Sequence, residues 1–177
     1  LFSAIPFTLS TLNMSFTDAF FESMSGITTT GSTVIIGLDY APPGILLWRA
    51  ILQWLGGIGV IIMAHCVLPF LQVGGMQIFR TELSEDEKAL PRTTQLASSI
   101  GLIYTALTIA CMFLYMFFGM GTFDALAHAL TTISTGGFST YDNSMAHFEK
   151  PSLDIIATLF MIMGGIPFVL YLKAVRG

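Results

Sequence analysis

The chain has 177 residues, of which 54% are hydrophobic and only 10% are charged, and its net charge is −4. Soluble domains carry about 25% charged residues, so this composition excludes an ordinary soluble domain and predicts an integral membrane protein, as does the mean hydropathy of +0.76. The few basic residues form no patch with interleaved aromatic residues, which argues against nucleic acid as a partner.

The chain opens with an apolar segment and a short helix. Leu1 to Leu12 is too short to cross a bilayer, which takes about 20 residues, so we expect it to be the outer end of a helix that starts earlier. Asp18 to Ile27 is predicted to be another short helix, with Thr17 or Asp18 as its N-cap. A helix of this length ends inside the membrane, as a pore helix does.

Thr28, Thr29, Thr30 and Gly31 follow this helix and offer backbone and hydroxyl oxygens. Irregular backbone at membrane depth is tolerated only where protein encloses it or where it lines a wet cavity. Glycine permits angles that turn successive carbonyls toward one axis, and a ring of carbonyls can replace the hydration shell of a cation. The helix also directs its negative C-terminal end to this place. The stretch is therefore predicted to be a selectivity filter.

Two carboxylates of this region have more than one interpretation. Asp18, and Asp124 in the second copy below, are expected to be helix N-caps that also contribute negative field at the outer vestibule. Glu22 lies within the pore helix, where a carboxylate is costly unless it is paired or hydrated. It is either paired behind the filter or placed on a wet face.

Gly37 to Gly44 is predicted to be an exposed outer loop, and Ile45 to Val73 the first full span. Trp48 and Arg49 are expected at the membrane interface, where Arg49 would extend its guanidinium to water. Gln53 is expected to bond either a neighbouring helix or the back of the filter.

Gly74 to Gln95 is a hydrophilic connector. Orientation follows the basic residues, which concentrate on the cytoplasmic side. On an alternating topology, five of the 7 Lys and Arg residues lie inside and two outside, so both filters open to the outside. The inner set is Arg80, Lys88, Arg92, Lys173 and Arg176, and the outer set is Arg49 and Lys150.

The second half repeats the first. The elements expected there are a span at Leu96 to Gly119, a pore helix at Phe123 to Ile133, a filter of Ser134, Thr135, Gly136 and Gly137, an outer loop at Ser139 to Ser152, and a span at Leu153 to Leu172. Gapless alignment pairs Thr29 with Thr135, Gly31 with Gly137, and Thr30 with Gly136, which predicts that Gly136 tolerates a side chain. Gly56 pairs with Gly164, and both are expected at helix packing contacts.

The repeat predicts an all-α integral membrane protein built from parallel copies of helix, pore helix, filter loop and helix. The first unit spans residues 1–73, the connector 74–95 and the second unit 96–177. We expect the transported ion, a cation, to contact Thr29, Thr30, Gly31, Thr135, Gly136 and Gly137.

Motifs for other chemistry are missing from the sequence. It has no Gly-x-Ser-x-Gly, no His-Glu-x-x-His and no phosphate-binding glycine loop, so we expect neither an enzyme nor a covalently bound cofactor. Cys66 and Cys111 lie in apolar runs and are interpreted as buried apolar side chains. His65 and His128 lack a second ligand at metal-site spacing and are interpreted as packing residues.

Five stretches together resemble the Trk/Ktr/HKT superfamily of potassium transporters, and most of all its bacterial TrkH/TrkG branch. They are Thr17-Asp18-Ala19-Phe20-Phe21-Glu22, Gly26-Ile27-Thr28-Thr29-Thr30-Gly31, Gln53-Trp54-Leu55-Gly56-Gly57-Ile58-Gly59, Val73-Gly74-Gly75-Met76-Gln77 and Gly136-Gly137-Phe138-Ser139-Thr140.

The resemblance implies multi-pass potassium uptake in the bacterial inner membrane, through four such units around one ion path. It also implies a homodimer and a cytosolic, TrkA-like nucleotide-binding regulatory subunit. Only two units are present here, so the partners include the remaining two units of a longer polypeptide, and the family's gating residues are not among these positions.

Three alternatives stay open. The first is a sodium- and potassium-permeable member of the same family; for either ion preference, a channel and an ion-coupled symporter both remain open. The second is a secondary transporter with broken helices and a midplane solute site. The third is a non-conducting assembly subunit.

Overall fold

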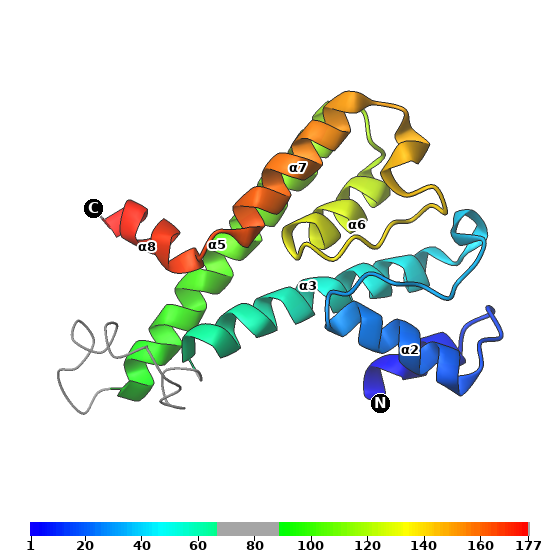
Figure 1. Cartoon of the computed structure of the whole chain (residues 1–177), viewed down its shortest axis with the longest axis horizontal. Helices are drawn as coiled ribbons and strands as arrows, with labels where there is room; N and C mark the ends of the chain where they lie inside the picture. Colours follow the sequence, from blue (N-terminus) through cyan, green and yellow to red (C-terminus); the bar gives the residue numbers. More distant parts are fainter. Residues whose placement is uncertain (67–88, 177) are drawn as a thin grey trace.

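The computed structural model describes residues 1–66 and 89–176, and regular structure in those ranges is helical throughout, without a strand. The elements in chain order are η1 (Phe2–Ala4), α1 (Ile5–Thr8), α2 (Phe16–Ile27), η2 (Leu38–Tyr40), α3 (Pro43–Cys66), α5 (Ala89–Phe117), α6 (Thr122–Ile133), η4 (Ser144–Phe148), α7 (Pro151–Gly165) and α8 (Phe168–Arg176). In Figure 1, α6 lies in the angle between α3 and the α5–α7 pair, and α2 lies along the other side of α3.

Helix length separates spanning helices from pore helices. Within the described residues, Pro43–Ala64 of α3 and Gln95–Phe117 of α5 are the two segments long and apolar enough to cross a membrane by length and composition. The helices α2 and α6 have 12 residues each and are too short to span. The predicted all-helical architecture, with its short helices followed by irregular segments, is confirmed.

Each unit has its own apolar core. Ala19 of α2, Ile35 beyond the first filter and Leu46 of α3 belong to the first core. The second core joins α5, α6, α7 and α8 and includes Tyr104 and Ile133. A third cluster lies at the seam between the units, where buried side chains of α3 meet those of α6; it comprises Ala50, Ala127 and Leu130.

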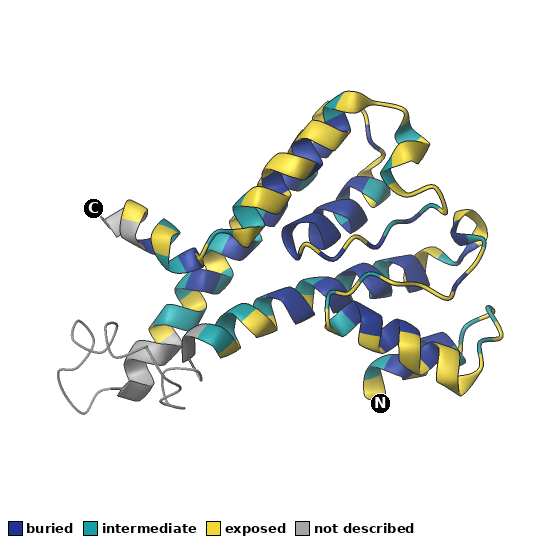
Figure 2. Cartoon of the chain, viewed as in Figure 1, coloured by how far each residue is buried: buried dark blue, intermediate teal, exposed yellow. Residues whose placement is uncertain are grey.

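The two pore helices differ in how far they are covered. In α6 the residues from Ala127 to Ile133 are all buried, whereas α2 exposes Phe16, Phe20, Phe21 and Met24. Figure 2 shows this contrast as a dark α6 and a largely yellow outer face of α2. The difference arises because α6 has α3, α5 and α7 around it, while the main long helix beside α2 is α3.

The expectation of one continuous last span, Leu153 to Leu172, is wrong. Helix α7 ends at Gly165, and α8 turns away from it in Figure 1. Pro167 has no N–H for a helical hydrogen bond, so it favours a break here. The new direction is held because Phe168 is 1% exposed and its ring lies 5.8 Å from that of Tyr104 on α5.

The expected N-caps are also wrong. Helix α2 is capped by Ser15, whose Oγ accepts a hydrogen bond from the Asp18 N–H at 3.1 Å and donates to the Asp18 carboxylate at 2.7 Å. In α6 the N-cap is Gly121, so Asp124 lies inside the first turn. Helix α5 begins at Ala89, within the segment expected to be connector; the rest of that connector, 74–88, is outside the described residues.

Candidate selectivity filter

The two filter segments have the same backbone conformation. Thr29 and Gly31 have φ values of 56° and 79°, and Thr135 and Gly137 have 54° and 80°. Thr30 and Gly136, which lie between them, are not among the residues with positive φ. A positive φ is unusual for threonine, so its occurrence at both aligned positions supports the predicted pairing of the two segments.

The N–H groups of both segments turn back to the pore helices. Each of two successive N–H groups donates to a carbonyl in the last turns of the preceding helix, at 2.9–3.0 Å; the bonds run from Thr29 to Gly26 and Thr30 to Ser25, and from Thr135 to Thr132 and Gly136 to Thr131. These bonds satisfy carbonyls that a helix end otherwise leaves unpaired. Since the N–H groups are used in this way, the carbonyls are the filter's available groups.

The first hydroxyl of each segment is committed to its own helix. Thr28 Oγ1 donates to the Met24 carbonyl at 2.8 Å, and Ser134 Oγ donates to the Leu130 carbonyl at 3.0 Å. Both hydroxyl protons are therefore used to stabilise the end of the pore helix. Only the lone pairs of these two hydroxyl oxygens are left for other contacts.

The glycines of the filter meet different surroundings. A Cβ on Gly31 would overlap the carbonyl oxygen of Gly136, so the two filter segments touch at this point. A Cβ on Gly136 would overlap the side chain of Gln53, whereas one on Gly137 would meet nothing within 4 Å. A side chain at Gly136 would have to displace the buried Gln53 amide, which counts against the expectation that this position tolerates a side chain as Thr30 does.

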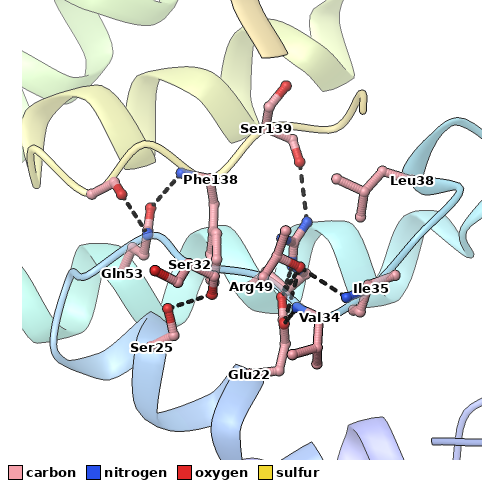
Figure 3. Close-up of polar contacts among 12 residues, drawn as sticks. Glu22, Ser25, Ser32, Val34, Ile35, Leu38, Arg49, Gln53, Phe138 and Ser139 are labelled. Carbon is pink, nitrogen blue, oxygen red and sulfur yellow. Dashed lines mark hydrogen bonds and ion pairs between the residues drawn. The ribbon is translucent and has the colours of Figure 1, made fainter. Parts of the chain in front are cut away.

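Gln53 of α3 bonds the back of the second filter. Its Nε2 donates to the Gly136 carbonyl at 2.9 Å, and its Oε1 accepts from the Phe138 N–H at 3.1 Å (Figure 3). The side chain is fully buried. Of the two alternatives for Gln53, the back of a filter is correct, and the filter is that of the other unit.

Arg49 does not reach the membrane interface, contrary to expectation. It is 1% exposed, and its Nε lies 2.7 Å from Oε1 of Glu22, which is fully buried (Figure 3). Its Nη1 donates to the Ser139 carbonyl at 3.1 Å, and its Cζ lies 4.1 Å from the centre of the Phe138 ring. A charge in the membrane interior is stabilised by an opposite charge and carbonyl oxygens, and here both are present.

Glu22 is thus paired behind the filter, which settles the alternatives for that residue. Its carboxylate also accepts hydrogen bonds from the Thr33 hydroxyl at 2.8 Å and the Val34 N–H at 3.0 Å. These bonds tie the chain just beyond the first filter to α2.

His128 of α6 occupies the position aligned with Glu22, and it likewise bonds the chain just beyond its own filter. Its Nε2 lies 2.9 Å from Ser139 Oγ, and its Nδ1 lies 2.8 Å from the Asp124 carbonyl. The Asp124 carbonyl can only accept, so the imidazole proton is assigned to Nδ1, and the Ser139 hydroxyl, which also accepts the Tyr141 N–H, donates to Nε2. The interpretation of His128 as a hydrogen-bonded packing residue is confirmed; the side chain of His65 is outside the described residues.

Carboxylates also fasten the outer ends of the two units. Asp124 accepts hydrogen bonds from Thr140 Oγ1 at 2.7 Å and from the Tyr141 hydroxyl at 3.1 Å. Partial burial, and then the bond to Asp124, raise the pKa of Tyr141. Asp142 accepts from the Leu38 N–H at 3.0 Å, so the two outer loops are joined.

No group of three or more His, Cys, Asp or Glu side chains that could hold a metal ion occurs among the described residues. Cys111 is a buried free thiol, as expected, and the side chain of Cys66 lies outside the described set.

Sequence reasoning missed the pairing of Arg49 with Glu22. A signal for it was present, because a charged residue inside an apolar segment is expected to have an opposite charge nearby. Both residues lie in apolar segments of a chain with 10% charge. The bond from Arg49 to the Ser139 carbonyl had no such signal, because a backbone acceptor is independent of residue type.

Comparison with known proteins agrees with the geometry. The TrkH family model, described as a cation transport protein, matches residues 2–176. The chain is 44% identical to the "Trk system potassium uptake protein TrkH" of Escherichia coli K12, over 98% of this chain and 37% of that protein. It is 39% identical to the corresponding TrkG, over 96% of this chain and 36% of TrkG.

A solved structure is also similar. The crystal structure of the potassium transporter TrkH from Vibrio parahaemolyticus matches with a TM-score of 0.73 and 44% identity, over 85% of this chain and 29% of that one. The chain spans little more than a third of the length of the relatives it matches. The family description is one of transport, in agreement with the expectation that the chain is not an enzyme. The resemblance predicted from five stretches is thereby confirmed, and the chain belongs to the TrkH family of cation transport proteins.

Proposed function

We propose that this chain supplies two of four filter segments to a potassium uptake pathway in the bacterial inner membrane. The observation that carries the proposal is the pair of filter segments with matching positive φ at Thr29 and Gly31 and at Thr135 and Gly137. The names of the relatives, which are potassium uptake proteins, give further support.

Potassium is proposed to bind the carbonyls of residues 28–31 and 134–137. The direct contacts are assigned to Thr29, Thr30, Gly31, Thr135, Gly136 and Gly137. In this set the Gly136 carbonyl is special, because one of its lone pairs accepts the Gln53 amide. Its share of the ion field is correspondingly smaller than that of the carbonyls of Gly31 and Gly137.

A cation is favoured over an anionic solute by the direction of the pore helices. The C-terminal ends of α2 and α6, at Ile27 and Ile133, adjoin the filter segments, and a helix C-terminus carries partial negative charge. A secondary transporter that binds a carboxylate at helix N-termini is the less supported candidate.

The proposed assembly has further parts. Residues 1–73 and 96–177 form one pore unit each, joined by a cytoplasmic connector at 74–95. Two more units of the same polypeptide complete the ring, a second copy forms a homodimer, and a TrkA-like nucleotide-binding subunit regulates it from the cytosol. Coupling to a second ion, as in symport, is left as an alternative to simple conduction.

Rubidium flux tests the proposal. The full-length protein containing this chain is reconstituted in liposomes, and uptake of labelled rubidium is measured against a potassium gradient. We expect uptake that potassium inhibits and sodium inhibits much less. Equal inhibition by both ions would support the sodium- and potassium-permeable alternative, and no uptake would contradict a conducting role.

A further inference from the structure

Two polar residues of α3 contact the filter of the other unit. Arg49 and Gln53 are four residues apart, so they lie on one face of the helix. Arg49 donates to the Ser139 carbonyl, and Gln53 bonds both Gly136 and Phe138. The helix of the first unit therefore bonds the second filter at one residue and the chain just beyond it at two.

Gln53 lies where the two filters touch. The Gly136 carbonyl that it binds is the group that a Cβ on Gly31 would overlap, and the Gln53 Nε2 is 3.6 Å from that Cβ position. The amide therefore fixes the second filter at its contact with the first.

Arg49 ties together the segments that follow the two filters. On one side it pairs with Glu22, which accepts hydrogen bonds from Thr33 and Val34 beyond the first filter. On the other side it donates to the carbonyl of Ser139 beyond the second filter. One guanidinium thus spans the two segments, and both it and its carboxylate partner are buried.

This arrangement is specific to α3 and is not a general feature of the repeat. Alignment of Gly56 with Gly164 places Ala157 and Met161 of α7 at the positions of Arg49 and Gln53. Neither side chain can form the equivalent hydrogen bonds. Helix packing in this fold therefore does not itself require the two polar residues of α3.

We infer that Arg49 and Gln53 are positioning residues that set the spacing of the two filter segments and thereby the preference for potassium over the smaller sodium ion. The inference rests on the proposed function. Selectivity in a carbonyl filter depends on the size of the cavity and on the number and field of its carbonyls. A change in the spacing of the segments alters these quantities without removing any ion ligand.

Replacement of Gln53 by Met tests the inference, since Met is similar in length but makes neither hydrogen bond. The full-length protein is reconstituted in liposomes, and rubidium uptake is measured with potassium or sodium as competitor. We expect the potassium-to-sodium preference to fall about tenfold, the change produced by differential stabilisation equal to one hydrogen bond. Maximal rubidium uptake should fall less than the preference does.

Thr108→Val is the matched control. Thr108 is buried, accepts a hydrogen bond from Trp54 of α3 at 3.0 Å and donates one to the Tyr104 carbonyl at 2.8 Å, and neither bond involves a filter residue. Its loss should lower the melting temperature without changing ion preference. If Gln53→Met changes the melting temperature as Thr108→Val does and leaves the ion preference intact, Gln53 has only a structural role and the inference fails.

If the Gln53→Met protein does not accumulate in the membrane, Gln53→Glu and Arg49→Lys are measured in its place. Glu retains the acceptor for the Phe138 N–H but opposes the Gly136 carbonyl, and Lys cannot bond Glu22 and Ser139 with the same planar geometry. Each is expected to weaken ion preference, and wild-type preference in both overturns the inference. Wild-type protein that shows no potassium preference contradicts the proposed function, so the two failures are distinguishable.

Discussion

Among single residues, the three filter glycines differ in what a side chain would meet. Serine at Gly31 or Gly136 would overlap neighbouring atoms, the Gly136 carbonyl in one case and the Gln53 side chain in the other. Serine at Gly137 meets no atom of this chain within 4 Å, and its cost here is the positive φ of 80°, which amounts to about 1–2 kcal/mol for a residue with a Cβ.

We therefore predict that Gly31→Ser and Gly136→Ser lose most potassium uptake and discrimination against sodium, whereas Gly137→Ser keeps more of both. Uptake by cells that lack other potassium transporters measures the effect, with membrane abundance of each variant as the control. If Gly137→Ser is more damaging than Gly136→Ser, the contact between Gly136 and Gln53 does not limit what the second filter accepts.

The residues of the two filter segments were predictable from residue type and from the repeat. The side chains that hold these segments in place were predictable only in part. Thr and Gly at aligned positions indicated the irregular backbone, and the positive φ values agree with that pairing. The sequence placed Arg49 at the interface because its position near the start of a span suits a snorkelling side chain. The pairing of Arg49 with Glu22 could not be read from the sequence, because it depends on how α2 packs against α3.

Among the elements, each helix that follows a filter approaches its pore helix through a glycine. A Cβ on Gly56 would overlap the carbonyl oxygen of Ile27, and one on Gly164 would lie 2.5 Å from that of Ile133. Ile27 and Ile133 are the last residues of α2 and α6. A side chain at either glycine thus pushes on the residue that precedes a filter segment.

We predict that Gly56→Ala lowers both thermal stability and rubidium uptake, since overpacking costs about 1–3 kcal/mol and here displaces the end of the pore helix. Gly59→Ala is the matched control, because a Cβ there meets nothing within 4 Å. Thermal unfolding in detergent and flux in liposomes measure the two effects. Normal flux in a destabilised Gly56→Ala protein would mean that the filter is insulated from this contact.

Hydropathy and the internal repeat predicted the elements well, except at the break between α7 and α8. Apolar side chains continue through Leu153 to Leu172, so periodicity gives no reason to end a helix there. Pro167 was a local signal, but proline is often accommodated in membrane helices. The burial of Phe168 against Tyr104, which holds α8 in its direction, is a tertiary contact that no local pattern encodes.

For the whole molecule, the basic residues and the joined outer loops support a prediction of sidedness. Asp142 links to Leu38, so both loops face the same side. We predict that a cysteine at Tyr40, which is 94% exposed, reacts with a membrane-impermeant maleimide added outside intact cells. A cysteine at Glu85, outside the described residues, should react only in inverted vesicles. Cys66 and Cys111 are replaced by alanine in both proteins, and labelling of both positions from one side contradicts the topology.

The uncovered face of α2 bears on whether two units suffice for conduction. Its exposed side chains are Phe16, Phe20, Phe21 and Met24. In α6, the positions aligned with the last three are Leu126, Ala127 and Leu130, which pack against α3. The repeat therefore assigns α2 an apolar helical neighbour equivalent to α3. Without it, the hydroxyl-bearing residues Thr28 and Thr30 are exposed as well.

We predict that the 177-residue chain reconstituted alone carries no rubidium flux, whereas the full-length protein does. In the proposed four-unit assembly two segments form only half of the ring, and polar backbone groups without partners in a bilayer cost several kcal/mol each. Flux in liposomes is measured at matched protein density, with helical content by circular dichroism as the control for folding. Potassium-selective flux through the chain alone would mean that its copies complete the ring with one another, and the α2 face would then be the contact between copies.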